Sequence, residues 1–210
     1  MTDLETAEEF HARVAAATDE QGRLPVAIEL MPGWDIFPFE LDGLRVKPLE
    51  PLADSDPPRQ GEDPADCGCR QPDKQARQVV WSNERWILKL LDMRLPVALI
   101  LMPREHYDLA DLPDDLAAEL GRLTVAITAA VEELPSVGRC HGARIGDGSA
   151  HLHPFFFGRP ARMLQLRGST LLDWEENLPP VPEEVRRANA AHVAARLVDR
   201  LGGDGPAWQD

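Results

Sequence analysis

The sequence is poor in tyrosine, in cysteine and in basic residues. Its 210 residues include one tyrosine and three cysteines, and 22 lysines and arginines stand against 36 aspartates and glutamates, which gives a formal net charge of −14. This excess of negative charge repels a phosphate backbone and an anionic membrane leaflet, so nonspecific nucleic-acid binding and electrostatic membrane docking are both disfavoured. No apolar run approaches the ~20 residues that a membrane-spanning helix needs.

The composition is otherwise that of an ordinary globular chain. The hydrophobic fraction is 43% and the charged fraction 28%, and the length predicts one large domain or one domain with additions. The odd number of cysteines and the lack of a charged-then-apolar leader predict a reducing, cytoplasmic compartment. The 19 prolines predict long ordered loops.

Hydrophobic spacing predicts helices and strands that are segregated along the chain rather than strictly alternating. Such an order favours an α+β fold, with an antiparallel sheet and a long helix packed on it. Helices are expected over 4–17 (capped by Thr2 or Asp3), 112–134 and 183–201, and strands over 34–40, 44–47, 78–81, 86–91, 96–102, 139–144 and 150–157. A short apolar run with β-branched residues covers 24–30. We divide the chain into an N-terminal helical extension (1–33), a main domain (34–182) with a proline-rich acidic loop (48–78), and a C-terminal helix and tail (183–210).

The segment from Gly146 to Pro160 carries the most chemistry. Because side chains alternate along a strand, His151, His153 and Phe155 would share one face, with the two imidazoles about 7 Å apart. Histidine is a nucleophile and a general acid or base near neutral pH. One imidazole can therefore attack a phosphorus atom while its neighbour positions an oxygen. The alternative from spacing alone is a metal-binding or merely exposed His-x-His pair.

Groups that suit a phosphate surround the two histidines. The turn formed by Asp147, Gly148 and Ser149 can present backbone N–H groups to an anion. Arginines on both sides can neutralise its charge; they are Arg144, Arg159, Arg162 and Arg167, with Arg139 completing a local basic patch. Phe155 can line a base pocket, although aromatic residues in strands more often belong to the core.

The segment resembles the signature of the histidine-triad (HIT) superfamily, His-φ-His-φ-His-φ-φ, where φ is apolar. The context is similar too, because the apolar strand ending in Met102-Pro103-Arg104-Glu105-His106, the long helix after it and the glycine turn stand where that family has them. Further segments resemble a little-characterised bacterial branch of HIT-like proteins and extend the likeness to about residue 182: Trp34–Glu40, Arg45–Pro48, His106–Pro113 and Leu164–Ser169.

The resemblance implies a HIT-like α+β fold and chemistry at the α-phosphate of a nucleotide or nucleotide conjugate. His153 would attack phosphorus to give a nucleotidyl-histidine that water or another acceptor resolves, and His151 would be the flanking histidine. The family needs no metal cofactor for this chemistry and often forms homodimers.

Three positions depart from the family pattern. Phe155 stands where the third histidine belongs, and apolar residues replace two supporting polar ones, at Ala98 (or Val97) and Ala143. Losing one such phosphate donor can lower a rate by two or three orders of magnitude. Three hypotheses therefore remain: a nucleotide hydrolase or nucleotidyltransferase, a weakened HIT-fold protein that binds a nucleotide or phosphate, and an enzyme of a specialised pathway that has reused the pocket.

The remaining cysteines and histidines have simpler interpretations. Cys67 and Cys69 lie where many family members carry part of a zinc site, which His106 could complete, and the alternative is two reduced thiols in a loop. Cys140 is expected to be a small buried residue. His141 is expected to point away from the site.

Overall fold

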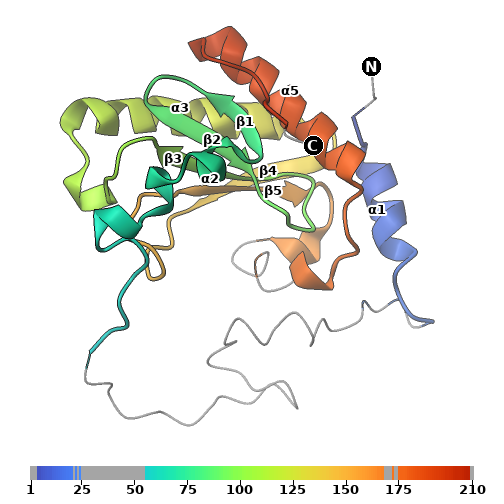
Figure 1. The fold of residues 1–210 in the computed structure, drawn as a ribbon. Helices are drawn as coiled ribbons and strands as arrows, with labels where there is room; N and C mark the ends of the chain where they lie inside the picture. Colours follow the sequence, from blue (N-terminus) through green and yellow to red (C-terminus); the bar gives the residue numbers. More distant parts are fainter. Residues whose placement is uncertain are drawn as a thin grey trace.

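The protein folds around a five-stranded antiparallel sheet with helices on both faces (Figure 1). The computed structural model describes residues 4–20, 22, 24, 55–167, 172 and 175–208. The α+β class, with a long helix on an antiparallel sheet, is therefore confirmed. The strands expected over 34–40 and 44–47 lie outside the described residues.

The sheet has the strand order β1-β2-β3-β5-β4, and every neighbouring pair is antiparallel. This order places β5 inside the sheet, between β3 and β4. The strands are β1 Val79–Ser82, β2 Trp86–Leu90, β3 Ala98–Pro103, β4 Val137–Ala143 and β5 Phe155–Pro160.

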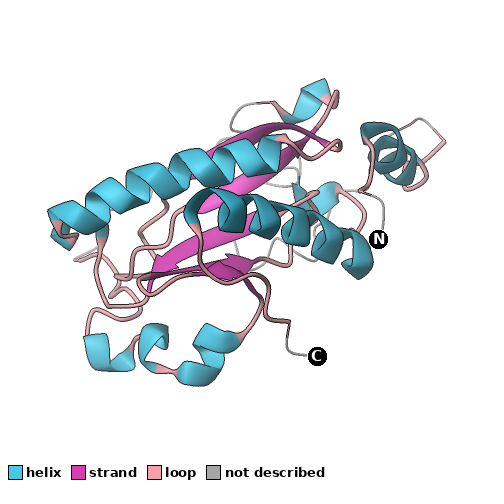
Figure 2. Cartoon of the chain, turned by 90° about the horizontal axis from the view of Figure 1, so that it is seen from above, coloured by secondary structure: helices cyan, strands magenta, loops and turns pink. Residues whose placement is uncertain are grey.

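One face of the sheet is covered by α3 (Asp114–Glu132) and α5 (Glu183–Leu201), which lie side by side over the strands (Figure 2). The apolar residues of α3 recur at steps of three and four, so they form one buried stripe. Their partners on the sheet include Leu88, Leu101 and Phe156. Both helices confirm the ranges expected from the sequence to within two residues.

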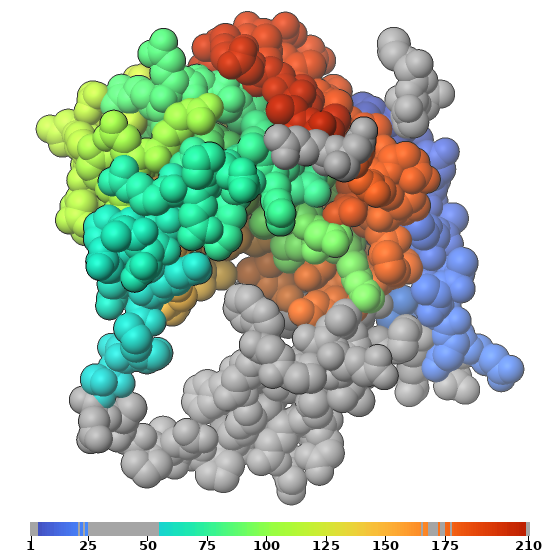
Figure 3. All heavy atoms as spheres, in the orientation of Figure 1, coloured from blue at the N-terminus to red at the C-terminus, as the bar shows by residue number. Residues whose placement is uncertain are grey.

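The opposite face packs against α1 (Ala7–Ala15) and the segment that follows β5. These two parts lie side by side on the surface of the molecule (Figure 3). Phe10 and Val14 of α1 are buried there beside Phe157 and Met163. Burial of one such apolar side chain contributes about 1.5–3 kcal/mol. The helix starts later than expected, because Thr6 rather than Thr2 or Asp3 caps it, in a reciprocal capping box with Glu9.

Strand β5 begins at Phe155 rather than at residue 150. Pro154 has no N–H to donate to the ladder, although its carbonyl accepts a hydrogen bond from Leu101 at 2.9 Å. The chain carrying His151 and His153 is therefore an irregular lead-in to the central strand. Here the side chains need not follow strict strand alternation.

Short helices shape the end of the proline-rich loop. They are the 3-10 turns Pro64–Asp66 and Gly68–Arg70 and the helix α2 Pro72–Ala76, and further 3-10 turns lie at Leu109–Asp111, Leu164–Leu166 and Glu175–Asn177. Near the C-terminal end of the described residues, Asp204 and Ala207 pair with the outer edge of β1. No helix within the described ranges is long and apolar enough to cross a lipid bilayer.

Candidate metal centre and active site

Two thiols and two imidazoles meet just beyond the end of β3. Cys67, Cys69, His106 and His151 each offer one ligand atom, and these four atoms lie within 4.8 Å of one another. The 3-10 turn Gly68–Arg70 brings the two cysteines together, and the N–H of Cys69 donates to the sulfur of Cys67 at 3.5 Å. The sequence had suggested the first three as a zinc site, and the structure adds His151.

The spacing of the four atoms suits a tetrahedral zinc ion. Thiolate and imidazole ligands at their usual zinc distances are about 3.3–3.8 Å apart. In the structure the two Nδ1 atoms of His106 and His151 are 3.4 Å apart. The distance from Cys67 Sγ to His151 Nδ1 is 3.5 Å, and that from Cys69 Sγ to His106 Nδ1 is 3.7 Å. The donor set and its spacing therefore both fit zinc.

The surroundings of His151 and Cys69 favour the uncharged form of each side chain. Burial lowers the pKa of His151, so its imidazole is neutral near pH 7 and can act as a ligand. Burial and the neighbouring Cys67 thiol raise the pKa of Cys69 to about 11. A metal ion that binds here would displace a proton from that thiol.

Asp108 ties together the three chain segments that carry the ligand residues. One carboxylate oxygen accepts from Nη1 of Arg59 at 2.7 Å, and the other from Nη2 of Arg144 at 2.5 Å. Nη1 of Arg59 also lies 3.4 Å from the carbonyl oxygen of Gly146. Burial raises the pKa of Asp108, but its hydrogen bonds from the two arginines and the backbone outweigh that effect and lower it to about 2. The sequence gives no signal for these ion pairs, because Arg59 and Arg144 are 49 and 36 residues away from Asp108.

The expected phosphate turn is anchored to the loop before the cysteines. The carbonyl of Gly148 accepts from the N–H of Gln60 at 3.0 Å, and Gln60 forms a parallel bridge with Ser149. The hydroxyl of Ser149 accepts from the N–H of His151 at 3.2 Å. Asp147 is exposed. Ser149 thus supports the backbone of the ligand histidine directly.

His153 starts a row of aromatic rings along β5. Its ring lies edge-on to Phe155, with centroids 5.2 Å apart, and Phe155 stacks on Phe157 at 5.6 Å. Strand pairing puts Ile100 and Ala143 on either side of Phe155. Nδ1 of His153 is buried and has no hydrogen-bond partner within the described part of the chain.

The arginines around this segment lie in different places. Arg144 pairs with Asp108, and Arg162 pairs with Glu8 of α1 at 2.5 Å. Arg159 is buried directly opposite Arg139, across the β4–β5 pair. Arg167 follows the 3-10 turn Leu164–Leu166 and is exposed.

The expectation that His141 points away from the site is wrong. His141 is paired with Phe157, and residues directly opposite in an antiparallel pair have their side chains on the same face. His141 therefore shares the sheet face of the aromatic row, two strand positions beyond Phe155. The relative register of two strands is set by tertiary pairing, which alternation within one strand cannot reveal.

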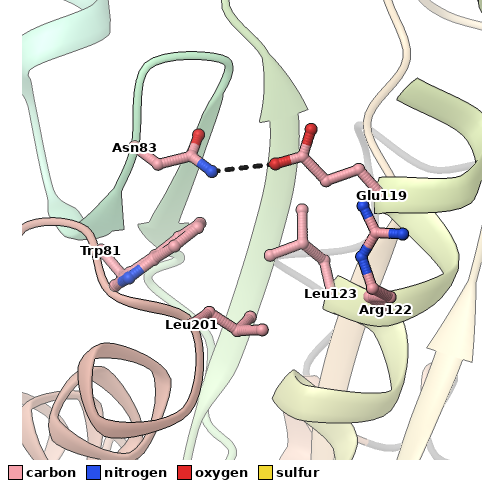
Figure 4. Close-up of a pocket in the computed structure, with 6 residues that line it drawn as sticks. All are labelled: Trp81, Asn83, Glu119, Arg122, Leu123 and Leu201. Atoms are coloured by element: carbon pink, nitrogen blue, oxygen red, sulfur yellow. Dashed lines mark hydrogen bonds between the residues drawn. The ribbon is translucent and has the colours of Figure 1, made fainter. Parts of the chain in front are cut away.

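A separate hollow of about 220 Å³ lies on the sheet face that α3 and α5 cover, between β1, α3 and the end of α5 (Figure 4). Leu123 and Leu201 form part of its wall, and an Asn83–Glu119 hydrogen bond of 3.0 Å crosses its rim. It shares no residue with the cluster of thiols and imidazoles.

No protein-family model matches the chain, and no curated protein matches it. Among solved structures, it is similar to a histidine-triad protein from Sinorhizobium meliloti (19% identity, TM-score 0.48, covering 60% of this chain and 94% of that one). It is also similar to a zinc-bound histidine-triad family protein from Mycobacterium smegmatis (17% identity, TM-score 0.44, covering 59% and 86%). A third is a uridylyltransferase (19% identity, TM-score 0.43, covering 63% of this chain and 45% of that one).

Proposed function

We propose that the protein is a HIT-like enzyme that transfers or hydrolyses a nucleotidyl group through His153, beside a structural zinc site. The observation that carries this proposal is that the two histidines of the His-x-His segment have different surroundings. His151 is held among two thiols and a second imidazole, whereas His153, two residues on, lies outside that cluster and against the ring of Phe155. One histidine anchors the segment and the other is left for chemistry.

In the proposed reaction, a neutral nitrogen of His153 donates its lone pair to the α-phosphorus of a nucleotide conjugate. A nitrogen–phosphorus bond forms, the bond from phosphorus to the leaving-group oxygen breaks, and the leaving group departs with the electron pair. Water or another acceptor then attacks phosphorus and regenerates the imidazole. Phe155 has no proton to give, so the leaving group must depart as an anion or take its proton from solvent.

Cys67, Cys69, His106 and His151 would hold the zinc ion. When bound, the ion would supply a rigid anchor for the backbone that leads into β5. Pro103, Ser149 and Asp108 support the same segment through hydrogen bonds and ion pairs from the protein itself. Together these contacts fix where the imidazole of His153 lies relative to the sheet.

A second candidate function is nucleotide or phosphate binding without turnover. It is favoured by the apolar surroundings of Phe155, because Ile100 and Ala143 flank that ring and neither can donate to a phosphate oxygen. Removing one preorganised donor can cost about 10²–10³ in rate. A protein of this kind would retain the pocket and lose the chemistry.

The experiment that tests the proposal is incubation of the zinc-loaded protein with adenylated and diadenosine substrates, followed by intact-mass measurement. We expect an adduct of one nucleotidyl group that is absent from His153→Asn and present in His141→Asn, the matched strand histidine. Nucleotide binding by calorimetry without adduct or turnover would favour the second function. Protein that neither binds nor turns over these nucleotides would contradict both.

A further inference from the structure

Arg159 is a buried cation that has no carboxylate partner among the residues that the structure describes. Its side chain belongs to β5 and only 8% of its surface is exposed. Its Nη1 atom donates to the carbonyl of Pro160 at 2.8 Å, and among the described residues no acidic side chain pairs with it. Buried guanidinium groups are normally paired, because desolvating an uncompensated charge is costly.

The surroundings of Arg159 add more positive charge. Arg139 lies directly opposite it on β4, where like charges destabilise a strand pair. Arg139 is exposed, donates to the carbonyl of Gly138 at 2.9 Å and likewise has no acidic partner within the described ranges. Burial lowers the pKa of Arg159, and the charges of Arg139 and Arg167 lower it further. A concentration of positive charge around a buried arginine is unusual in a protein whose net charge is −14.

The backbone makes room for the buried guanidinium. The pairing of β4 with β5 shifts register between Val137 and Arg139, which marks a bulge at Gly138. A Cβ atom at Gly138 would lie 2.5 Å from Nη2 of Arg159 and 3.1 Å from its Cζ. Gly138 does not have a positive φ angle, so the space rather than the backbone conformation requires a glycine. Bulges often redirect a side chain at functional sites.

We propose that Arg139 and Arg159 form an anion-binding site, separate from His153, that takes a phosphate group. Two guanidinium groups side by side suit a dianion, because each can donate two hydrogen bonds to its oxygens. The bound charge would offset the repulsion between the arginines and the desolvation of Arg159. The buried ring of Phe157 lies on β5 between this site and the Phe155–His153 end of the row. The site therefore does not depend on the chemistry proposed for His153.

The test is a ³¹P NMR titration of inorganic phosphate and of ATP into the His153→Asn protein, at constant ionic strength. This background removes the proposed nucleophile, so failure of the enzymatic proposal cannot change the result. We expect saturable phosphate binding that Arg139→Gln weakens by about tenfold or more, the loss of a charge-assisted hydrogen bond. Gly138→Ala should weaken it similarly by displacing the guanidinium of Arg159. Arg200→Gln, the same change at an exposed position of α5, should leave it unaltered.

The two ligands distinguish a free phosphate from the tail of a nucleotide. Equal affinity for both supports recognition of the phosphate alone, and tighter binding of ATP supports a nucleotide tail, provided that Arg139→Gln weakens either one. The proposal is overturned if neither ligand binds, or if Arg139→Gln and Arg200→Gln bind equally well. Arg139 is exposed, so its substitution tests the site without disturbing the core.

Discussion

The Nε2 atom of His151 lies 3.0 Å from the carbonyl oxygen of Pro103. Because a carbonyl can only accept, Nε2 carries the ring proton and Nδ1 presents its lone pair to the thiol of Cys67, 3.5 Å away. Metal-binding histidines commonly donate their second ring nitrogen to such an acceptor, which fixes the tautomer and the ring orientation. The protein scaffold thus sets the ligand nitrogen of His151 without help from an ion.

We expect the purified protein to contain about one zinc ion per chain, because four donor atoms lie within 4.8 Å of one another and three of their separations match those of a tetrahedral site. Cys67→Ser should lose the metal and melt at a lower temperature, whereas Cys140→Ser, which alters a cysteine outside the cluster, should keep both properties. Elemental analysis and thermal melting measure this. Full zinc content in Cys67→Ser would refute the assignment.

Asp108→Asn should weaken zinc binding by about 10- to 100-fold, as loss of an outer partner typically does. The amide cannot balance the charges of Arg59 and Arg144, so the segments that carry the ligands lose their common anchor. Competition with a chelator of known affinity measures the effect. The control is Asp111→Asn, an exposed acid three residues away. Equal affinities for the two variants would show that Asp108 does not position the cluster.

Phe155→His should raise turnover of a diadenosine substrate by about 10²-fold, because it restores a hydrogen-bond donor beside His153. The control Phe155→Leu removes the aromatic ring without adding a donor and should not accelerate the reaction. Steady-state kinetics with both variants measure the difference. A histidine variant no faster than the leucine variant would mean that the missing donor does not limit the rate.

Glu175 predicts a pH dependence of stability. Burial raises its pKa above the ordinary 4.5, so the folded state holds this proton more tightly than the unfolded chain does. Its contribution to the free energy of unfolding is therefore largest below pH 4.5 and declines as the pH rises through the raised pKa.

Glu175→Gln should remove this dependence. The amide oxygen can still accept from the N–H of Arg94, now 2.9 Å from the carboxylate, and it carries no charge to desolvate. We expect the variant to be more stable than the wild type at pH 7 and the difference to shrink at pH 4, by urea denaturation. Glu176→Gln is the matched control. A constant difference across this range would contradict the prediction.

Gly203→Ala should destabilise the protein by about 2–4 kcal/mol. Gly203 has a φ of +90°, and a Cβ atom there would lie 2.5 Å from the carbonyl oxygen of Ser82. The substitution would push the tail off β1 and break the 2.8 Å hydrogen bond from Trp81 Nε1 to Gly202. Gly205→Ala, with no atom near the added methyl group, should change stability little. Similar denaturation midpoints for the two variants would contradict this account.

The sequence predicts the helices α3 and α5 and the positions of strands β1 to β4, because hydrophobic spacing is a local property. Strand β5 was misplaced because the apolar pattern continued through Pro154, where the ladder loses a donor. The expected cap of α1 also differs from the structure, because Thr2, Asp3 and Thr6 can each accept from the backbone. Thr2 has Glu5 at the same capping-box spacing as Thr6 has Glu9, so the local pattern does not choose between them.

The site was predicted less completely, because its contacts join distant segments. The sequence predicts Cys67, Cys69 and His106 as a candidate zinc set, but it places the fourth donor, His151, at the phosphate instead. Its contact with Cys67 spans 84 positions. Arg144 and Arg162 also pair with acidic residues that are distant in the sequence, Asp108 and Glu8. A cluster of arginines in the sequence therefore does not reveal that two of them are already paired with carboxylates.

The 84-residue separation of Cys67 and His151 determines when the four ligand residues can come together during folding. During synthesis Cys67 and Cys69 leave the ribosome well before His106, and His151 follows only after most of the sheet has been made. An ion bound early by the two thiols would lack His151, its buried imidazole ligand, until β3 and the residues before β5 come together. Full metal affinity should thus arise late in folding, once these distant segments have closed their loop.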